Sequence, residues 1–302
     1  MNAQGGQPIS LTEPTRRQWI KTAAWVCTGS ALGLGASAVQ AQELFDLEKV
    51  RAGGVLKVAV YKDNAPYSDG KGQDMSGVDV ALAQALATEM GLKLSLLPFD
   101  AGEKMDDDLR NMVWKGHYLG YGPADVMLHV PVDKFLMTEN RQALIFAPYS
   151  REVLVVFHAL DRLPTLQSGL DLQGLPLAAE RGSGAASTLI GFGSGRLRSQ
   201  VKMFNSGIDA AQAVIQGDAA AAYVSRAQAE TALRASGRPA SGFGLTQLTL
   251  PGLADNGWPI GMAVKSSNKQ LAHALEAALQ KVRADGRLLA MYRDRGLTLV
   301  AP

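Results

Sequence analysis

The chain has 302 residues, of which 47% are hydrophobic and 19% are charged, and its formal net charge is +2 at pH 7. These values are those of an ordinary globular protein that can bury a core, and the length suits one or two domains. The small net charge gives no support for nucleic-acid binding. The sequence shows no zinc-like spacing of cysteine and histidine, no phosphate-binding glycine loop and no nucleophile elbow. We therefore expect no metal, no cofactor and no catalytic residues.

The first 41 residues are arranged like a cleaved export signal. A basic region with Arg16, Arg17 and Lys21 precedes a weakly apolar stretch, residues 22–38, which is rich in alanine and glycine. The triplet 39–41 then has the small residues that a signal peptidase accepts. We predict that this segment is removed and that the mature protein is periplasmic.

Residues 15–21 resemble a twin-arginine signal at every position of its pattern. Cys27 is the sole cysteine, so cleavage near Ala41 leaves a chain without disulfides. Cleavage also removes three basic residues and one acidic residue, which leaves a nearly neutral protein that is not embedded in a membrane. An amphipathic N-terminal helix and a retained membrane anchor are the alternatives, and the Thr, Ser and Gly residues of the apolar stretch argue against an anchor.

After this segment, the hydrophobic pattern predicts alternating helices and strands. A buried strand at residues 55–60, an amphipathic helix over residues 80–90 and a second strand at residues 92–97 form a βαβ unit. Such a unit predicts a parallel sheet with its function at the carboxyl ends of the strands. The other predicted elements are a helix at 43–52, a loop at 62–73, a helix at 106–114 with a solvated acidic start, strands at 125–129, 153–157 and 175–179, helices after residue 184 and at 208–216, a strand at 219–224, and helices at 269–284 and after the turn 285–286.

Four segments carry a resemblance to one family. GVLKVAVYKDNAPYSD (54–69) has the character of a first strand and ligand loop, and GVDVALAQALATEMGLKLSLLPFD (77–100) that of a first helix and second strand. MTENRQALIFAPYSREVLVV (137–156) looks like a crossing segment with its Pro-Tyr pair, and residues 257–296 look like a closing strand and helices. Together they resemble the family-3 periplasmic solute-binding proteins, which include the polar amino-acid receptors of ABC transporters.

This resemblance implies an α/β fold with two lobes, each a mainly parallel sheet flanked by helices, joined by two crossing strands. Lobe one would contain residues 43–152 and 255–302, and lobe two would contain residues 153–254. The ligand would bind in the cleft of a monomer, and the lobes would close over it by a hinge motion.

The resemblance also implies ligand-binding residues. An arginine in a Thr-x-x-Arg motif holds the ligand carboxylate in the amino-acid receptors, and Thr138 to Arg141 match this motif. Additional residues before Thr138 leave a surface role for Arg141 open. The acidic acceptor for the ligand ammonium falls on Ser225, whose hydroxyl cannot balance a buried charge. We therefore expect a ligand other than an ordinary α-amino acid.

The remaining candidates lie in loops and at strand ends. Gly182 and Ser183 form a turn that opens a helix, and this turn either offers N–H groups to an anion or is a plain helix cap. Tyr61 and Tyr67 of the first loop either stack on a ligand or pack. His129 lies at the carboxyl end of a strand, where it is either a ligand contact or a hydrogen-bonded structural residue.

Three functions follow from the sequence. The leading hypothesis is a receptor, not an enzyme, that delivers a small anionic or aromatic organic solute to an ABC transporter or a sensor. The alternative is an accessory protein of a periplasmic quinoprotein alcohol dehydrogenase, because residues 148–151 also match the Pro-Tyr-x-Arg pattern of that branch. The third is a lyase of the cyclohexadienyl-dehydratase kind, which needs a cleft acid with a shifted pKa that the sequence does not reveal.

Overall fold

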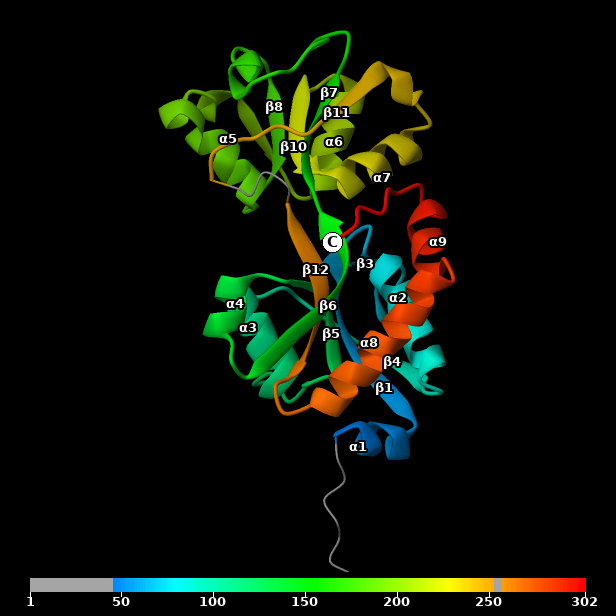
Figure 1. Ribbon diagram of the computed structural model, residues 1–302. Helices are drawn as coiled ribbons and strands as arrows, with labels where there is room; N and C mark the ends of the chain where they lie inside the picture. Colours follow the sequence, from blue (N-terminus) through cyan, green and yellow to red (C-terminus); the bar gives the residue numbers. More distant parts are fainter. Residues whose placement is uncertain (1–45, 253–256) are drawn as a thin grey trace, which may run out of the picture. The chain divides into compact units, whose positions relative to one another are not determined.

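In the computed structural model of this chain, residues 46–252 and 257–302 are described, and they form two five-stranded sheets flanked by helices (Figure 1). The predicted α/β architecture is thus confirmed. The predicted signal segment and its cleavage near Ala41 lie outside the described residues. Over the two ranges just given, no helix has both the length and the apolar character needed to cross a bilayer.

The first sheet has the strand order β4-β1-β5-β12-β6. Its strands are β1 (Val55–Tyr61), β4 (Lys93–Phe99), β5 (Val126–Pro131), β6 (Ala143–Glu152) and β12 (Trp258–Lys265). β1 runs parallel to both β4 and β5, as the βαβ pattern predicts, whereas β12 runs antiparallel to β5 and β6. The carboxyl ends of β1 and β5 therefore meet at one edge of the sheet.

Helices cover both faces of the first sheet (Figure 1). On one face lie α1 (Asp46–Gly53), α2 (Val78–Glu89), α8 (Lys269–Ala284) and α9 (Arg287–Arg293); on the other lie α3 (Met105–Leu109), the π-helical turn η2 (Arg110–Trp114) and α4 (Lys134–Glu139). Leu82 and Leu275 are fully buried in the same cluster as Val58 of the sheet. Burial of these apolar stripes is the main force that holds the helices in place.

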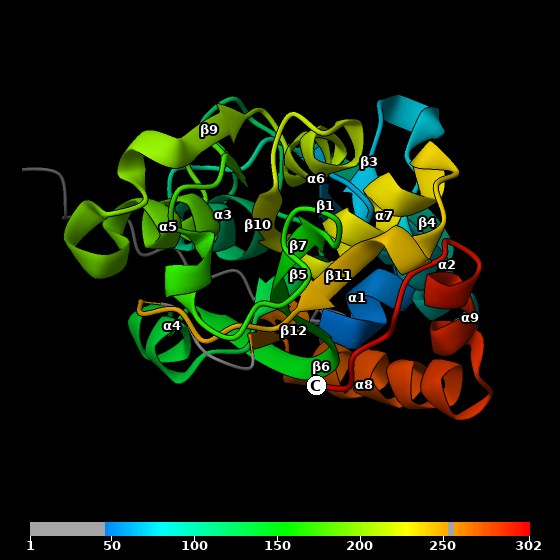
Figure 2. The ribbon, with the colours of Figure 1, turned by 90° about the horizontal axis from the view of Figure 1, so that it is seen from above.

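The second sheet has the order β11-β7-β10-β8-β9. Its strands are β7 (Leu154–Ala159), β8 (Leu177–Glu180), β9 (Val201–Phe204), β10 (Ala221–Ser225) and β11 (Phe243–Thr246). One face packs against α6 (Gly207–Gln216) and α7 (Arg226–Ser236), and the other against α5 (Gly184–Gly195), as Figure 2 shows from above. α7, β9 and β11 are elements that the sequence patterns do not predict.

Short elements complete the described chain. They are the hairpin strands β2 (Asp63–Asn64) and β3 (Ser68–Asp69) and the 3-10 turns η1 (Gly72–Asp74), η3 (Gly169–Leu172), η4 (Arg198–Gln200) and η5 (Ala240–Gly242). The hairpin lies in the segment expected to be a loop. The chain leaves the first sheet after Glu152 and enters the second sheet at Leu154, so that β6 and β7 are almost continuous.

Candidate ligand-binding site

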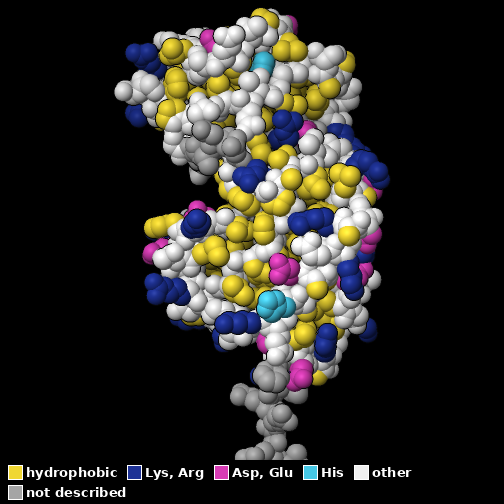
Figure 3. Space-filling model, in the orientation of Figure 1, with side chains coloured by type: hydrophobic (Ala, Val, Ile, Leu, Met, Phe, Trp, Pro, Cys, Tyr) yellow, Lys and Arg dark blue, Asp and Glu magenta, His cyan; other side chains and the backbone are white. Residues whose placement is uncertain are grey.

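A cavity of about 720 Å³ lies where strand ends of both sheets meet. Figure 3 shows a hollow in the surface between the parts of the chain that form the two sheets. Acidic residues outnumber basic ones in its lining, which includes Asp63, Asp100, Glu103, Asp108, Glu152 and Glu180 against Lys104 and His129. A negatively charged lining disfavours an anionic ligand, so the expectation of an anionic solute is not supported.

His129 stands at the centre of a buried polar cluster. Its Nδ1 lies 2.8 Å from Oδ2 of Asp79, and its Nε2 lies 3.7 Å from Oε2 of Glu152. Its φ of 61° is unusual for a residue other than glycine, and its backbone N–H donates to the Tyr149 hydroxyl at 3.0 Å. The Tyr149 hydroxyl in turn donates to Oδ1 of Asp79 at 2.7 Å. The strand end and α2 thus hold the imidazole in one orientation.

The two carboxylates change the proton affinity of this histidine. Burial acts to lower the pKa of His129, but the charge and hydrogen bond of Asp79 and the charge of Glu152 outweigh burial and raise the pKa above its ordinary value. Asp79 is fully buried, so little solvent screens it. The cluster therefore favours an imidazolium ion between Asp79 and Glu152.

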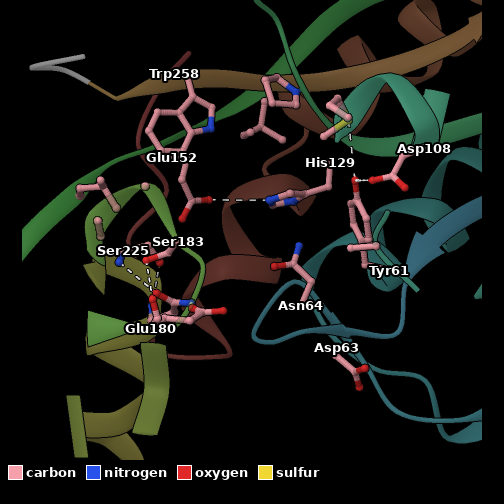
Figure 4. Close-up of a pocket in the computed structure, with 18 of the residues that line it drawn as sticks. Tyr61, Asp63, Asn64, Asp108, His129, Glu152, Glu180, Ser183, Ser225 and Trp258 are labelled. Atoms are coloured by element: carbon pink, nitrogen blue, oxygen red, sulfur yellow. Dashed lines mark hydrogen bonds and ion pairs between the residues drawn. The ribbon is translucent and has the colours of Figure 1, made fainter. Parts of the chain in front are cut away.

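Glu152 presents its carboxyl group to the cavity (Figure 4). The residue is 9% exposed, and its Oε2 accepts no hydrogen bond from any residue that the structure describes. Burial and, after it, the nearby Glu152 carboxyl group raise the pKa of the Tyr67 hydroxyl well above its ordinary value. Trp258 is the direct cross-strand partner of Glu152 in the antiparallel β6–β12 pair, and its ring also lines the cavity.

The second sheet contributes an acid that the sequence patterns do not single out. Glu180, at the end of β8, accepts hydrogen bonds from Gly207 N at 2.9 Å and from Gln228 Nε2 at 3.0 Å. Gln228 also exchanges hydrogen bonds with Ser225, which caps α7. The position where the resemblance places an acidic residue is thus a serine, but a carboxylate from the neighbouring strand lies beside it.

Ser183 has two local hydrogen bonds at the start of α5. Its hydroxyl accepts from Ala186 N at 3.1 Å and donates to the Glu180 carbonyl at 2.8 Å. This is the geometry of a helix cap. Ser183 and Gly184 line the cavity, whereas Gly182 does not belong to its lining.

Tyr61 and Asp108 form a third part of the lining. The Tyr61 hydroxyl donates to Oδ2 of Asp108 at 2.9 Å, and Gly102 N donates to Oδ1 at 2.7 Å. Burial raises the pKa of Asp108, although these two hydrogen bonds act against the rise. The acidic run 106–108 is therefore not wholly a solvated helix start, because its third residue is 5% exposed and faces the cavity.

Two other predicted residues lie elsewhere. Arg141 follows α4, is exposed, and donates through Nε to the Thr138 carbonyl at 3.4 Å; it does not line the cavity. The additional residues before it form α4, whose start Asp133 caps by accepting from Leu136 N at 2.8 Å. Tyr67 lies beside His129, with 4.4 Å between the ring centroids, and belongs to the buried cluster rather than to the lining.

The Pro-Tyr-x-Arg segment has a mainly structural place. Tyr149 is 1% exposed, and Ser150 is buried. Arg151 donates through Nε to the carbonyl of Ala301 near the carboxyl terminus. Among the residues that the structure describes, no group of three or more His, Cys, Asp or Glu side chains is placed to hold a metal ion.

No protein-family model matches the sequence, and no curated protein matches it either. Solved structures do. An ancestral cationic amino acid solute-binding protein is 18% identical, with 83% of this chain and 99% of that chain covered and a TM-score of 0.64. An amino acid ABC transporter substrate-binding protein from Streptococcus pneumoniae, bound to L-arginine, is 19% identical, with 85% and 100% covered and a TM-score of 0.59.

A histidine kinase sensor domain with similarity to periplasmic binding proteins is also similar, at 20% identity, with 82% of this chain and 98% of that domain covered and a TM-score of 0.57. At these identities, the likeness establishes the fold and leaves the ligand open. The chain has the two-lobe fold of the periplasmic binding proteins, with its acidic cavity where the strand ends of the two sheets meet.

Proposed function

We propose that this protein is a periplasmic solute-binding protein of the family-3 type. It captures a small organic solute in the cavity and delivers it to an ABC transporter or to a sensor. One observation carries the proposal: a single cavity is lined by strand ends of both sheets, next to the point where the chain crosses from one sheet to the other. Closure of the two lobes over a solute would bury it from both sides.

The structurally similar solute-binding proteins and the sensor domain support this role; one of those proteins is a cationic amino acid solute-binding protein, and another was solved with L-arginine bound. In the proposed division, residues 43–152 with 255–302 and residues 153–254 form the two lobes. The predicted export signal agrees with a periplasmic location.

Ligand binding tests the proposal. The exported protein is screened by thermal shift against amines, amino acids, organic acids and alcohols, because a solute that binds only the native state raises the melting temperature. Leu154→Trp places a bulky ring in the cavity lining and should abolish the shift. Leu170→Trp is the matched control, since Leu170 is 53% exposed and lies outside the lining. If no solute of any class binds, or if both variants bind equally, the proposal is wrong.

A lyase on this scaffold is the second candidate, because the structure reveals what the sequence did not: a cavity-lining histidine with a raised pKa between two carboxylates. The fate of a solute that the screen identifies separates the two functions. A receptor returns its solute unchanged when the bound molecule is recovered and weighed by mass spectrometry, whereas a lyase returns a lighter product.

A further inference from the structure

The charge of the cavity carries information about its occupant. Six acidic residues belong to its lining, against one lysine and one histidine. The lysine, Lys104, is exposed to solvent, and Asp100 already has a partner in Lys62, with 2.7 Å between Nζ and Oδ2. The negative charge in the lining therefore exceeds the positive charge, and a cationic solute would be concentrated there.

Glu152 shows where a cation would sit. It shares one imidazolium ion with Asp79, which lies closer to that ion, at 2.8 Å against 3.7 Å. His129 thus faces two carboxyl groups, and Glu152 is the more distant of the two. Oε2 of Glu152 is buried, faces Nε2 of His129 at 3.7 Å and accepts no hydrogen bond from the described part of the chain, so a donor on a solute that reaches this carboxyl group would supply a hydrogen bond that the protein does not.

Trp258 completes this position. It stands directly opposite Glu152 on the neighbouring antiparallel strand, so both side chains lie on the same face of the sheet, towards the cavity (Figure 4). An indole face attracts cations through its quadrupole, and the attraction is stronger where the contact is desolvated. A carboxylate beside a tryptophan ring is thus suited to an ammonium or guanidinium group.

Among the described residues of the lining, Lys104 and His129 are the two cationic side chains that could meet a carboxylate group on the solute; Lys104 is exposed to solvent, and His129 already faces Asp79 and Glu152. None of the arginines in the described ranges lines the cavity, and Arg141 bonds to the Thr138 carbonyl instead. The N-terminus of α5 reaches the cavity, but the Ala186 N–H already donates to the Ser183 hydroxyl. The carboxyl group of Glu180, three residues before Ser183, adds a negative charge nearby. A carboxylate that entered would lose its water beside several like charges.

We propose that the cavity selects an organic cation that carries no carboxylate group, such as an alkyl amine, a diamine or a guanidine, and that its cationic group lies between Glu152 and Trp258. This inference rests on the proposed solute-binding function and specifies its ligand class. It differs from the capture of a cationic amino acid, whose carboxylate would need a positively charged partner less exposed than Lys104.

Matched pairs of probes test the inference. Agmatine and arginine, cadaverine and lysine, and putrescine and ornithine differ within each pair by one carboxylate, and glutarate serves as an anion. Calorimetric titration of the exported protein should give affinities for the amines about tenfold or more above those for the paired amino acids, since the carboxylate of each amino acid would lose its water beside several like charges. Amine affinity should fall as the salt concentration rises.

Variants locate the cation. Glu152→Gln should weaken amine binding by about 10- to 100-fold, the equivalent of one charge-assisted hydrogen bond. Glu276→Gln, on the exposed side of α8, removes the same charge far along the chain and should leave the affinity unchanged. Should Glu152→Gln fold poorly, Trp258→Leu tests the same position without altering any charge and should weaken amine binding.

The outcomes separate two failures. If amino acids bind as tightly as their amines, or if only neutral or anionic solutes bind, the inference about ligand class is wrong and the solute-binding function stands. If amines bind but neither Glu152→Gln nor Trp258→Leu weakens them, the proposed position of the cation is wrong. If no probe and no solute of the wider screen binds, the proposed function fails, and this inference fails with it.

Discussion

Removal of one buried hydroxyl group tests the polar cluster around His129. Tyr149 is 1% exposed, and burial together with the nearby Asp79 raises its pKa well above the ordinary value, so the hydroxyl keeps its proton. Tyr149→Phe removes a hydrogen bond to a buried carboxylate, which is worth about 1.5–3 kcal/mol, and leaves the backbone N–H of His129 without its acceptor, at a cost of about 1–3 kcal/mol. We expect the free energy of unfolding to fall by about 3–5 kcal/mol.

Urea unfolding followed by circular dichroism measures this change, and the melting temperature should fall by roughly 6–20 °C for a chain of this size. Tyr118→Phe is the control, because Tyr118 is 88% exposed and keeps its ring contact with His117 in the variant. A Tyr149→Phe protein as stable as the Tyr118→Phe protein would refute the account of the cluster.

Three further changes test other parts of the structure. Because the pKa of His129 is raised in the folded state, its protonation stabilises the fold below the unfolded pKa of 6.5, and this stabilisation is lost as the pH rises through the folded pKa. His129→Gln should therefore reduce the difference between the free energies of unfolding measured in urea at about pH 6 and pH 9. Gly77→Ala should cost several kcal/mol in unfolding experiments, because a Cβ would collide with the Tyr67 carbonyl oxygen and the φ of 131° disfavours any side chain. Gly53→Ala, with open space around it, should be neutral or slightly stabilising. Ser183→Ala should lower the melting temperature by the equivalent of about 1 kcal/mol, the usual contribution of a helix cap; a variant without effect would mean that the hydroxyl does not cap α5.

Long periodic segments explain why most of the fold could be predicted. The helix expected at residues 269–284 has those bounds in α8, and the βαβ unit of β1, α2 and β4 is parallel as expected. Each of these segments carries a full apolar stripe or a buried run, which leaves few alternatives. The 3-10 turns and the short strand β11 lack such a pattern, because four residues do not define a period.

The site was harder to predict than the fold. Tyr61, His129, Ser183 and Ser225 do line the cavity, but Glu180 was missed, because a single acid at a strand end looks like any solvated acid. Its proximity to Ser225 depends on the strand order β7-β10-β8, which no local pattern encodes. Ligand roles for the predicted site residues, like the lobe boundaries, remain predictions.

Arg141, by contrast, was predicted to bind the ligand but lies outside the lining. The Thr-x-x-Arg spacing is present, but the extra residues before it form α4 and carry the arginine away from the lining. The Thr-x-x-Arg motif fixes only two residue types and their spacing, so it does not show where an inserted helix moves the arginine. Glu152, which lines the cavity, lies eleven positions after Arg141, and no motif in the sequence marks it as a site residue.

The position of Trp258 gives the protein an intrinsic optical signal. Of the two tryptophans in the described ranges, Trp114 packs against the helix-covered core, whereas Trp258 borders the cavity beside Glu152. Indole emission depends on the polarity and charge around the ring, so a solute that displaces water there should shift its wavelength or intensity. In the exported protein without the predicted signal segment, which contains Trp19 and Trp25, a Trp114→Phe variant would report occupancy through Trp258 alone and would allow cargo binding to be followed in real time without a label.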